Sequence, residues 1–173
     1  MAHTFNTHGG IHEIPLDAAV GRMWLCGKHF VAPQVEQVRA QHSIGRVVCL
    51  VEEHELTGRY DSYVHWHQQS AGAAGLWFPI PDLSYPRVEQ ALGFIQELSD
   101  YVCNTGNILV HCAAGIGRAG TTATAVLMTL GMDMHEAIHH VRAHRPMAGP
   151  ESGTQMEFIH QLDEYIRDNA VHE

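Results

Sequence analysis

The sequence lacks the segments that insert a chain into a membrane or direct it there. It has no run of about 18 apolar residues, the length that a membrane helix needs. Its first residues, MAHTFNTHGG, have neither the basic start nor the apolar stretch of a secretory signal. We therefore expect a soluble, cytoplasmic protein.

Basic residues are also scarce. Ten Lys and Arg stand against 19 Asp and Glu, which gives a formal net charge of −9 with histidine neutral. An acidic protein is repelled by nucleic acid and by anionic membranes, so we expect neither as a partner. Any site for a phosphate group must then be built locally.

Cysteine and histidine form no complete metal motif. The four cysteines are Cys26, Cys49, Cys103 and Cys112. They contain no C-x-x-C pair, which predicts reduced thiols rather than a zinc or redox site. Histidines cluster at 65–67 and at 135–144, where residues four apart on a helix could hold an ion or simply form a polar face. Because no cysteine or carboxylate cluster completes either group, we expect no metal and no cofactor.

The chain has no repeat, low-complexity tract or linker, which predicts a single domain over residues 1–173 with a flexible segment at 1–10. Strands are expected at 11–16, 22–27, 46–53, 76–80 and 107–112. Helices are expected at 32–43, 59–69, 86–104, 117–131, 132–146 and 152–169. This order predicts an α/β fold with a mostly parallel central sheet flanked by helices, in which ligands gather at the carboxyl ends of the strands.

One loop between an expected strand and an expected helix has the composition of an anion site. It reads HCAAGIGRAGT over residues 111–121, with five residues between Cys112 and Arg118. Its glycines allow the backbone N–H groups to turn inward, and the helix N-terminus and Arg118 add positive charge. The same field favours a thiolate at Cys112, which could act as a nucleophile on phosphorus. The alternative is a buried cysteine before a tight turn.

The loop resembles the H-C-x5-R signature of the cysteine-dependent protein tyrosine phosphatase superfamily. The resemblance extends over residues 20–165 and is strongest to the small atypical dual-specificity phosphatases, which implies their fold. Low-molecular-weight tyrosine phosphatases share the Cys-to-Arg spacing but place it near the N-terminus. The resemblance implies that the loop residues Ala113, Ala114, Gly115, Ile116, Gly117 and Arg118 bind the phosphate, with His111 supporting them.

The resemblance also implies roles for residues outside the loop. Asp82 lies 30 residues before Cys112 and matches the general acid of the family. Gln155 matches a glutamine that orients the water for hydrolysis of the phosphocysteine. Glu52 matches an acidic residue that holds Arg118 by an ion pair.

The sequence departs from the family at Ala119. Most relatives have Ser or Thr directly after the arginine, where the hydroxyl stabilises the cysteine sulfur. Neither Thr121 nor Thr122 is an obvious substitute, because one faces away and the other lies a turn deeper in the expected helix. We therefore expect the phosphocysteine to break down more slowly than it forms.

The uncharged loop residues Ala113, Ala114 and Ile116 favour a substrate with a single phosphate, since relatives that act on phosphoinositides tend to have lysines there. We expect a phosphorylated protein or peptide, with phosphotyrosine first and phosphoserine or phosphothreonine second. Aromatic residues near Asp82 could line the pocket. These are Trp77, Phe78 and Tyr85.

Three alternatives stay open. The chain could hydrolyse a small phosphometabolite or a lipid head group, or it could bind phosphate without turnover, as a pseudophosphatase. Cys49 could form a disulfide with an oxidised Cys112, or could be a buried apolar residue.

Overall fold

Five strands form one sheet in the computed structural model, which describes residues 9–170. They are β1 (Ile11–Ile14), β2 (Met23–Gly27), β3 (Ile44–Cys49), β4 (Gly75–Trp77) and β5 (Asn107–Cys112). The order across the sheet is β1-β2-β5-β3-β4, and only the β1–β2 pair is antiparallel. The predicted α/β fold with a mostly parallel sheet is confirmed.

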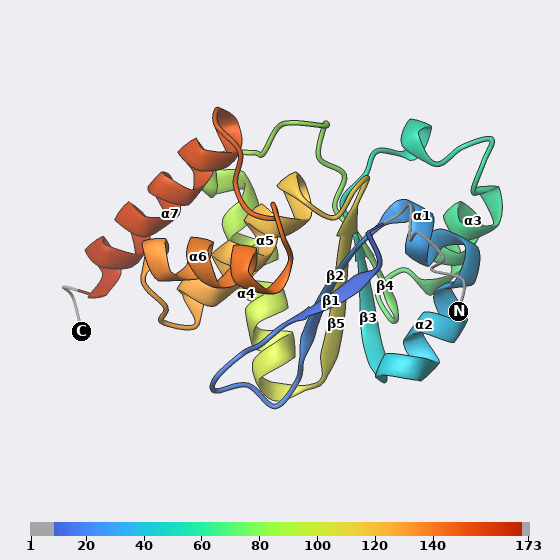
Figure 1. The fold of residues 1–173 in the computed structure, drawn as a ribbon, viewed down its shortest axis with the longest axis horizontal. Coiled ribbons are helices and arrows are strands. Elements are labelled where there is room, and N and C mark those ends of the chain that lie inside the picture. Colours follow the sequence, from blue (N-terminus) through green and yellow to red (C-terminus); the bar gives the residue numbers. More distant parts are fainter. Residues whose placement is uncertain (1–8, 171–173) are drawn as a thin grey trace, which may run out of the picture.

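Helices cover both faces of this sheet (Figure 1). One face holds α1 (Lys28–Val31), α2 (Val35–His42) and α3 (Asp61–Ser70), and the other holds α4 (Val88–Asn104), α5 (Gly117–Thr129), α6 (Met134–His144) and α7 (Thr154–Ala170). Because both faces are covered, the central strands are apolar on both sides rather than alternating. Residues Ile108 to Cys112 of β5 are all buried.

β5 lies in the middle of the sheet and sets the position of the functional loop. Its register places Cys112 opposite Gly27 of β2 and His111 opposite Cys49 of β3. The carboxyl ends of three parallel strands therefore meet where β5 gives way to the loop and to α5. This is the edge at which an α/β fold binds its ligands.

The expected helix at 32–43 and the expected strand at 46–53 differ from the structure. The helix begins earlier and is divided into α1, the 3₁₀ helix η1 (Ala32–Gln34) and α2, with Pro33 in the first turn of η1. The strand ends at Cys49, and the chain then enters the 3₁₀ helix η2 (Glu53–Glu55). A reciprocal capping box between Glu52 and Glu55 explains this early end, because it satisfies backbone N–H groups that a strand would have paired.

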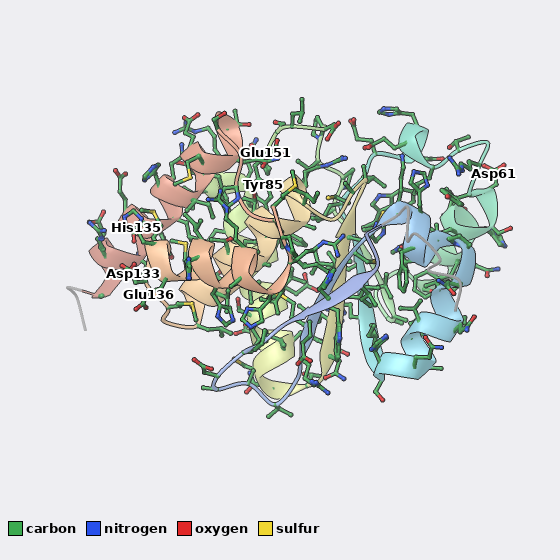
Figure 2. The ribbon with its side chains drawn as sticks, viewed as in Figure 1. Asp61, Tyr85, Asp133, His135, Glu136 and Glu151 are labelled. Atoms are coloured by element: carbon green, nitrogen blue, oxygen red, sulfur yellow. The ribbon has the colours of Figure 1, made fainter. Side chains whose placement is uncertain are left out.

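The histidine-rich helix α6 has an ordinary helix start. The side chain of Asp133 accepts hydrogen bonds from the N–H groups of His135 and Glu136 (Figure 2). Further along, His140 donates to the carbonyl of Pro15 at 2.8 Å, and His144 donates to the carbonyl of His140 at 2.8 Å. These two histidines thus serve as polar donors to the backbone.

Most of the segment predicted to be flexible, residues 1–8, lies outside the described residues. Gly9 and Gly10 are described, and their carbonyls accept hydrogen bonds from Arg145 at 3.4 and 3.2 Å. Within residues 9–170, no helix combines the length and apolar character needed to cross a bilayer.

Candidate active site

In the loop between β5 and α5, the backbone carbonyl of each of residues 113–116 accepts a hydrogen bond. The N–H of Lys28 donates to Ala113 O at 3.1 Å, and Arg145 donates to Ala114 O at 2.9 Å and to Gly115 O at 2.7 Å. Ile116 O accepts from two backbone N–H groups in α5 and the segment after α6. The loop is thus held by its acceptors.

The N–H groups of the same loop are left for a ligand. Across residues 9–170, no acceptor is found for the backbone N–H groups of residues 113–118, and no side chain caps α5. Gly115 makes the turn possible, because its φ is +72° and a Cβ there would collide with the carbonyl of Cys26. Inward N–H groups at a helix N-terminus form a site for a tetrahedral anion.

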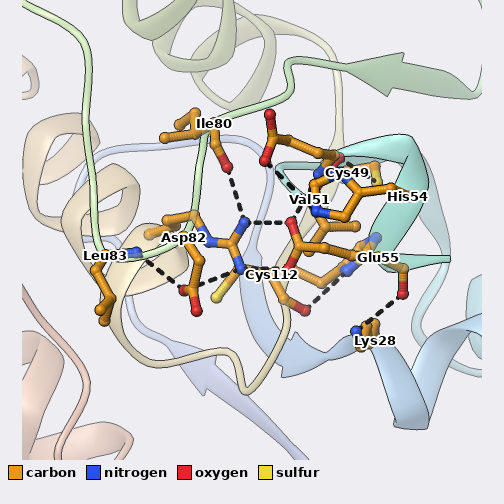
Figure 3. Close-up of polar contacts among 12 residues, drawn as sticks. Lys28, Cys49, Val51, His54, Glu55, Ile80, Asp82, Leu83 and Cys112 are labelled. Atoms are coloured by element: carbon orange, nitrogen blue, oxygen red, sulfur yellow. Dashed lines mark hydrogen bonds and ion pairs between the residues drawn. The ribbon is translucent and has the colours of Figure 1, made fainter.

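Arg118 lies near Cys112, and three hydrogen bonds to two groups fix its guanidinium (Figure 3). One terminal nitrogen donates to Glu55 at 2.8 Å and to Ile80 O at 2.8 Å, and the other donates to Glu55 at 2.9 Å. The side chain is only 1% exposed. Its Nε–H has no acceptor among the described residues, so it remains for an anion in the loop.

The predicted partner of Arg118 was wrong by three residues. Sequence reasoning assigned the ion pair to Glu52, but the structure assigns it to Glu55. Glu52 belongs to the capping box of η2 and lies 3.9 Å from His54. Because the strand ends early, the 3₁₀ turn carries Glu55 rather than Glu52 over the arginine.

The charge state of Glu55 follows from its contacts. Burial alone would raise the pKa of Glu55. The hydrogen bonds from Arg118 and from the Glu52 N–H, with the charges of Arg118 and Lys28, outweigh burial and hold that pKa below its ordinary value. Glu55 is therefore ionised at neutral pH beside Arg118.

Asp82 reaches the same guanidinium from the segment after β4. Its Oδ1 lies 3.2 Å from the second terminal nitrogen of Arg118 and also accepts from the N–H of Leu83 at 2.9 Å. The Asp82 side chain is 66% exposed, so it stands at the mouth of the loop rather than beneath it. The structure therefore brings Asp82, Arg118 and Cys112 together, as the sequence predicted.

His111 fixes the main chain at Cys112 through a buried relay. Its Nδ1 lies 3.2 Å from Cys112 O, its Nε2 lies 2.7 Å from the hydroxyl of Tyr63, and that hydroxyl lies 2.9 Å from Nε2 of His67. Burial lowers the pKa of His111 to about 3 and that of His67 to about 4, so both rings are neutral.

The carbonyl of Cys112, at one end of the relay, determines which atom carries each proton in it. A carbonyl only accepts, so Nδ1 of His111 carries the proton and Nε2 accepts from the Tyr63 hydroxyl. The tyrosine oxygen in turn accepts from Nε2–H of His67. Nδ1 of His67 is then a bare acceptor, and no partner for it occurs in the described part of the chain.

Cys49 lies next to the two histidines of this relay. Its sulfur and a ring nitrogen from each of His67 and His111 lie within 4.8 Å of one another, the only such trio among residues 9–170. Tyr63 already occupies Nε2 of both rings. Burial raises the pKa of the Cys49 thiol to about 12, so it is a neutral buried group; its disulfide with Cys112 stays a prediction.

The hydroxyl groups near Ala119 have other partners. Thr121 donates to Gly117 O at 2.7 Å and Thr122 donates to Arg118 O at 2.9 Å. Tyr85 completes the arrangement by donating to the Thr122 oxygen at 2.8 Å. In the described chain the Cys112 sulfur therefore has no hydroxyl partner, and Ala119 leaves the position of the usual hydroxyl without one.

Gln155 lies against the start of α5. It is 1% exposed, and its Oε1 accepts from the N–H of Glu151 at 3.0 Å. A Cβ on Gly117 would come within 3.0 Å of its Nε2, so the amide packs directly on the loop. The structure thus places Gln155 beside the loop, at Gly117.

The aromatic residues expected to line the pocket are packing residues instead. Trp77 donates to Val51 O at 2.7 Å, Phe78 stacks on Phe94, and Tyr85 stacks on Phe158. None of the three lines the pocket of about 640 Å³ that opens beside Ala113, Ala114 and Ile116 of the loop. The prediction failed because nearness to Asp82 in sequence does not determine the direction in which a side chain points.

Sequence reasoning also missed Lys28, Tyr63, His67 and Arg145. Arg145 had a weak signal, since it precedes a proline that ends α6. The other three belong to helices far from the loop in sequence, and only the sheet register brings them to it.

Comparison with known proteins agrees with this geometry. A family profile described as "Dual specificity phosphatase, catalytic domain" matches residues 34–168. The chain belongs to this family. The predicted membership in the cysteine-dependent phosphatase superfamily is thereby confirmed.

Individual curated relatives match over different lengths. Human dual specificity protein phosphatase 15 is 43% identical over 63 residues, which is 36% of this chain and 20% of that protein. Mouse serine/threonine/tyrosine-interacting protein is 33% identical over 89 residues, 49% of this chain and 38% of that protein. The chain thus matches less than half the length of these curated relatives.

A solved structure matches nearly end to end. Tk-PTP in its active form has 31% sequence identity and a TM-score of 0.68, with 88% of this chain and 96% of that chain covered. The likeness therefore extends over most of the fold.

Proposed function

We propose that the protein hydrolyses phosphate monoesters of tyrosine residues in proteins or peptides, with phosphoserine and phosphothreonine as secondary substrates, through a phosphocysteine intermediate. The observation that supports this best is the hydrogen bonding of the loop. The carbonyls of residues 113–116 all accept hydrogen bonds, while the N–H groups of residues 113–118 have no acceptor within residues 9–170. A dianionic phosphate fits that cradle with Cys112 at its base.

Substrate binding replaces a contact in the site. The phosphate accepts a hydrogen bond from the Nε–H of Arg118. It also competes with Asp82 for the second terminal nitrogen, because a phosphate oxygen and the Asp82 carboxylate would accept from the same N–H group. Asp82 is then released toward the leaving group. Glu55 and Ile80 O keep the guanidinium in position throughout.

In the first half of the reaction the Cys112 thiolate attacks phosphorus and the bond from phosphorus to the ester oxygen breaks. Protonated Asp82 gives its proton to that oxygen, and the alcohol or phenol leaves. The negative charge on the phosphoryl oxygens is met by the loop N–H groups and Arg118.

In the second half a water molecule attacks the phosphocysteine. Gln155 orients the water, Asp82 accepts its proton, and the phosphorus–sulfur bond breaks to release phosphate and the thiolate. No hydroxyl assists the departing sulfur at Ala119, so this half is the slower one.

Hydrolysis of a generic aryl phosphate tests the proposal. Wild type should release phosphate and Cys112→Ser should not, and acid quenching of wild type should trap a phosphoryl group on the peptide that contains Cys112. A wild type as inactive as Cys112→Ser would reject the proposal. Faster turnover of a phosphometabolite panel than of phosphotyrosine peptides would replace the substrate class.

A second candidate function rests on Ala119 and on the match to mouse serine/threonine/tyrosine-interacting protein. In this reading the loop binds phosphorylated proteins without turnover, as a pseudophosphatase. The presence of Asp82 at 3.2 Å from Arg118, with Cys112 near enough to act on the charge of Arg118, favours catalysis instead. Phosphopeptide binding by wild type with no phosphate release would support the second candidate.

A further inference from the structure

Asp82, the general acid of the proposed function, lies in a tight turn. The N–H of Ser84 donates to Pro81 O at 3.1 Å, which closes a β-turn with Asp82 and Leu83 at its centre. Leu83 has a φ of +61°, in the left-handed region that favours glycine, and its side chain is 69% exposed, so its own packing does little to hold that conformation. Such a turn persists only where the surrounding structure holds it.

Two contacts hold the Asp82 carboxylate within residues 9–170 (Figure 3). One is the N–H of Leu83 at 2.9 Å, which belongs to the same turn and moves with it. The other is Arg118 at 3.2 Å, which the phosphate takes over when substrate binds in the proposed function. The position of the carboxylate at the leaving group then depends on the anchors at the two ends of the turn.

The end before the turn is bonded to the sheet side of the site. Ile80 donates its N–H to Leu50 O at 2.9 Å, and its carbonyl accepts from Arg118 at 2.8 Å. Both backbone groups of Ile80 are therefore in use, and the chain enters the turn from a fixed point.

The end after the turn is anchored by Tyr85, which is 4% exposed. Its ring stacks on Phe158 with the ring centroids 4.4 Å apart, and its N–H donates to Thr154 Oγ1 at 3.1 Å. Thr154 directly precedes Gln155 in α7. The acid turn is therefore attached to the helix that carries the residue proposed to orient the water.

The hydroxyl of Tyr85 leads back to Arg118. Tyr85 donates to the Thr122 oxygen at 2.8 Å, and Thr122 donates to Arg118 O at 2.9 Å, because a carbonyl can only accept. Burial raises the pKa of Tyr85, so this hydroxyl keeps its proton. The two hydroxyls thus connect the acid turn to the main chain of the arginine that binds the phosphate.

We propose that Tyr85 is a positioning residue for Asp82: its hydroxyl, acting through Thr122, keeps the acid turn at the leaving group once the phosphate has taken Arg118 from Asp82. Tyr85 acts through the backbone of the turn and takes no part in the proton transfer. This proposal rests on the proposed function, since it requires Asp82 to be the general acid.

A series of aryl phosphates tests the role of Tyr85. Tyr85→Phe keeps the ring and the backbone N–H and removes only the hydroxyl. We expect it to lower kcat/KM about five- to tenfold on phenyl phosphate, the effect of one lost buried hydrogen bond, and less than about twofold on a dinitrophenyl phosphate, whose phenoxide leaves without a proton. An equal loss on both esters would assign Tyr85 a merely structural role, and no loss on either would leave it without one in catalysis; both results overturn the proposal.

Variants of Thr122 test the connection to Arg118. Thr122→Val should reproduce the selective loss on phenyl phosphate, whereas Thr122→Ser, which keeps the hydroxyl, should retain most of the wild-type rate. The double variant Tyr85→Phe/Thr122→Val should lose no more than Tyr85→Phe alone. Multiplied losses would show that the two hydroxyls act separately and would contradict the proposal. Tyr165→Phe, which alters a tyrosine that is 37% exposed on α7, is the matched control and should behave as wild type.

Asp82→Asn on the same esters distinguishes the two possible failures. If Asp82→Asn is selectively slow on phenyl phosphate and Tyr85→Phe is not, the positioning role is wrong and the acid role of Asp82 stands. If Asp82→Asn itself shows no selectivity for the leaving group, the acid step of the proposed function is wrong.

Discussion

Both terminal nitrogens of Arg118 donate to the carboxylate of Glu55, at 2.8 and 2.9 Å. Because Arg118 is 1% exposed and Glu55 13% exposed at the side chain, this pair is shielded from water and determines where the guanidinium points. The arginine can therefore meet a phosphate without first being ordered by it.

We predict that Glu55→Gln lowers kcat/KM on an aryl phosphate by roughly one to two powers of ten, the worth of a charge-assisted hydrogen-bond pair. The matched control is Glu52→Gln, which should stay within about twofold of wild type, because its amide can still accept the capping hydrogen bond. Steady-state kinetics of both purified variants measures the difference. Equal losses in the two variants would contradict the assignment of Glu55.

A hydroxyl at position 119 should speed the second half of the reaction. Ala119→Ser supplies the donor that Thr121 and Thr122 give instead to carbonyls. We expect turnover to rise and the pre-steady-state burst to shrink, by an amount equivalent to roughly 1–3 kcal/mol in the breakdown step. Stopped-flow release of nitrophenol measures both. Unchanged turnover together with an unchanged burst would show that the missing hydroxyl is irrelevant.

Asp82→Asn should act most strongly on esters with poor leaving groups. Loss of the proton donor is expected to cost about 10²–10³-fold on phenyl phosphate and little on a dinitrophenyl phosphate, whose phenoxide leaves unassisted. Since Asp82 also competes for Arg118, the same variant should bind inorganic phosphate more tightly. A uniform loss across the leaving-group series would argue against its role as an acid.

The buried histidines should make the fold sensitive to mild acid. The pKa of His67 is lowered to about 4 and that of His111 to about 3, whereas both titrate near 6.5 when the chain is unfolded. Below pH 6.5 the unfolded state binds protons that the folded state does not, so stability present above this pH falls as the pH approaches 4. We expect a loss of about 1–2 kcal/mol per histidine between pH 6.5 and 5.

Urea unfolding from pH 7.5 to 5 measures that slope. His67→Leu should flatten it by about one proton, while His54→Gln, which alters a side chain that is 75% exposed, should leave it unchanged. A His67→Leu slope equal to that of wild type would mean that His67 is already charged in the folded protein.

The loop and its strand were predictable because their signals are local. Cys112, the glycines and Arg118 lie within one short stretch, and a strand followed by a helix N-terminus is enough to form an anion site. The strand 107–112 was predicted with its observed bounds, since a buried β-branched run between a helix end and a glycine loop has few other interpretations.

Partners that reach the loop from a distance were not predictable in the same way. Whether Glu52 or Glu55 meets Arg118 depends on where β3 ends, and a continuous apolar run does not mark that point. Lys28 and Tyr63 lie in α1 and α3, and Arg145 directly follows α6. The placement of these helices follows from the sheet order β1-β2-β5-β3-β4. That order is a property of the whole chain.

The loop holds its shape through its main chain alone. Lys28 N–H, Arg145 and two further backbone N–H groups fix the carbonyls of residues 113–116, and the side chains of Ala113, Ala114 and Ile116 take no part. Mutation can therefore change the chemistry of three positions around the phosphate without dismantling the cradle. Altering those three side chains should therefore redirect the proposed activity to a new phosphate ester while Cys112, Arg118 and the loop backbone stay as they are.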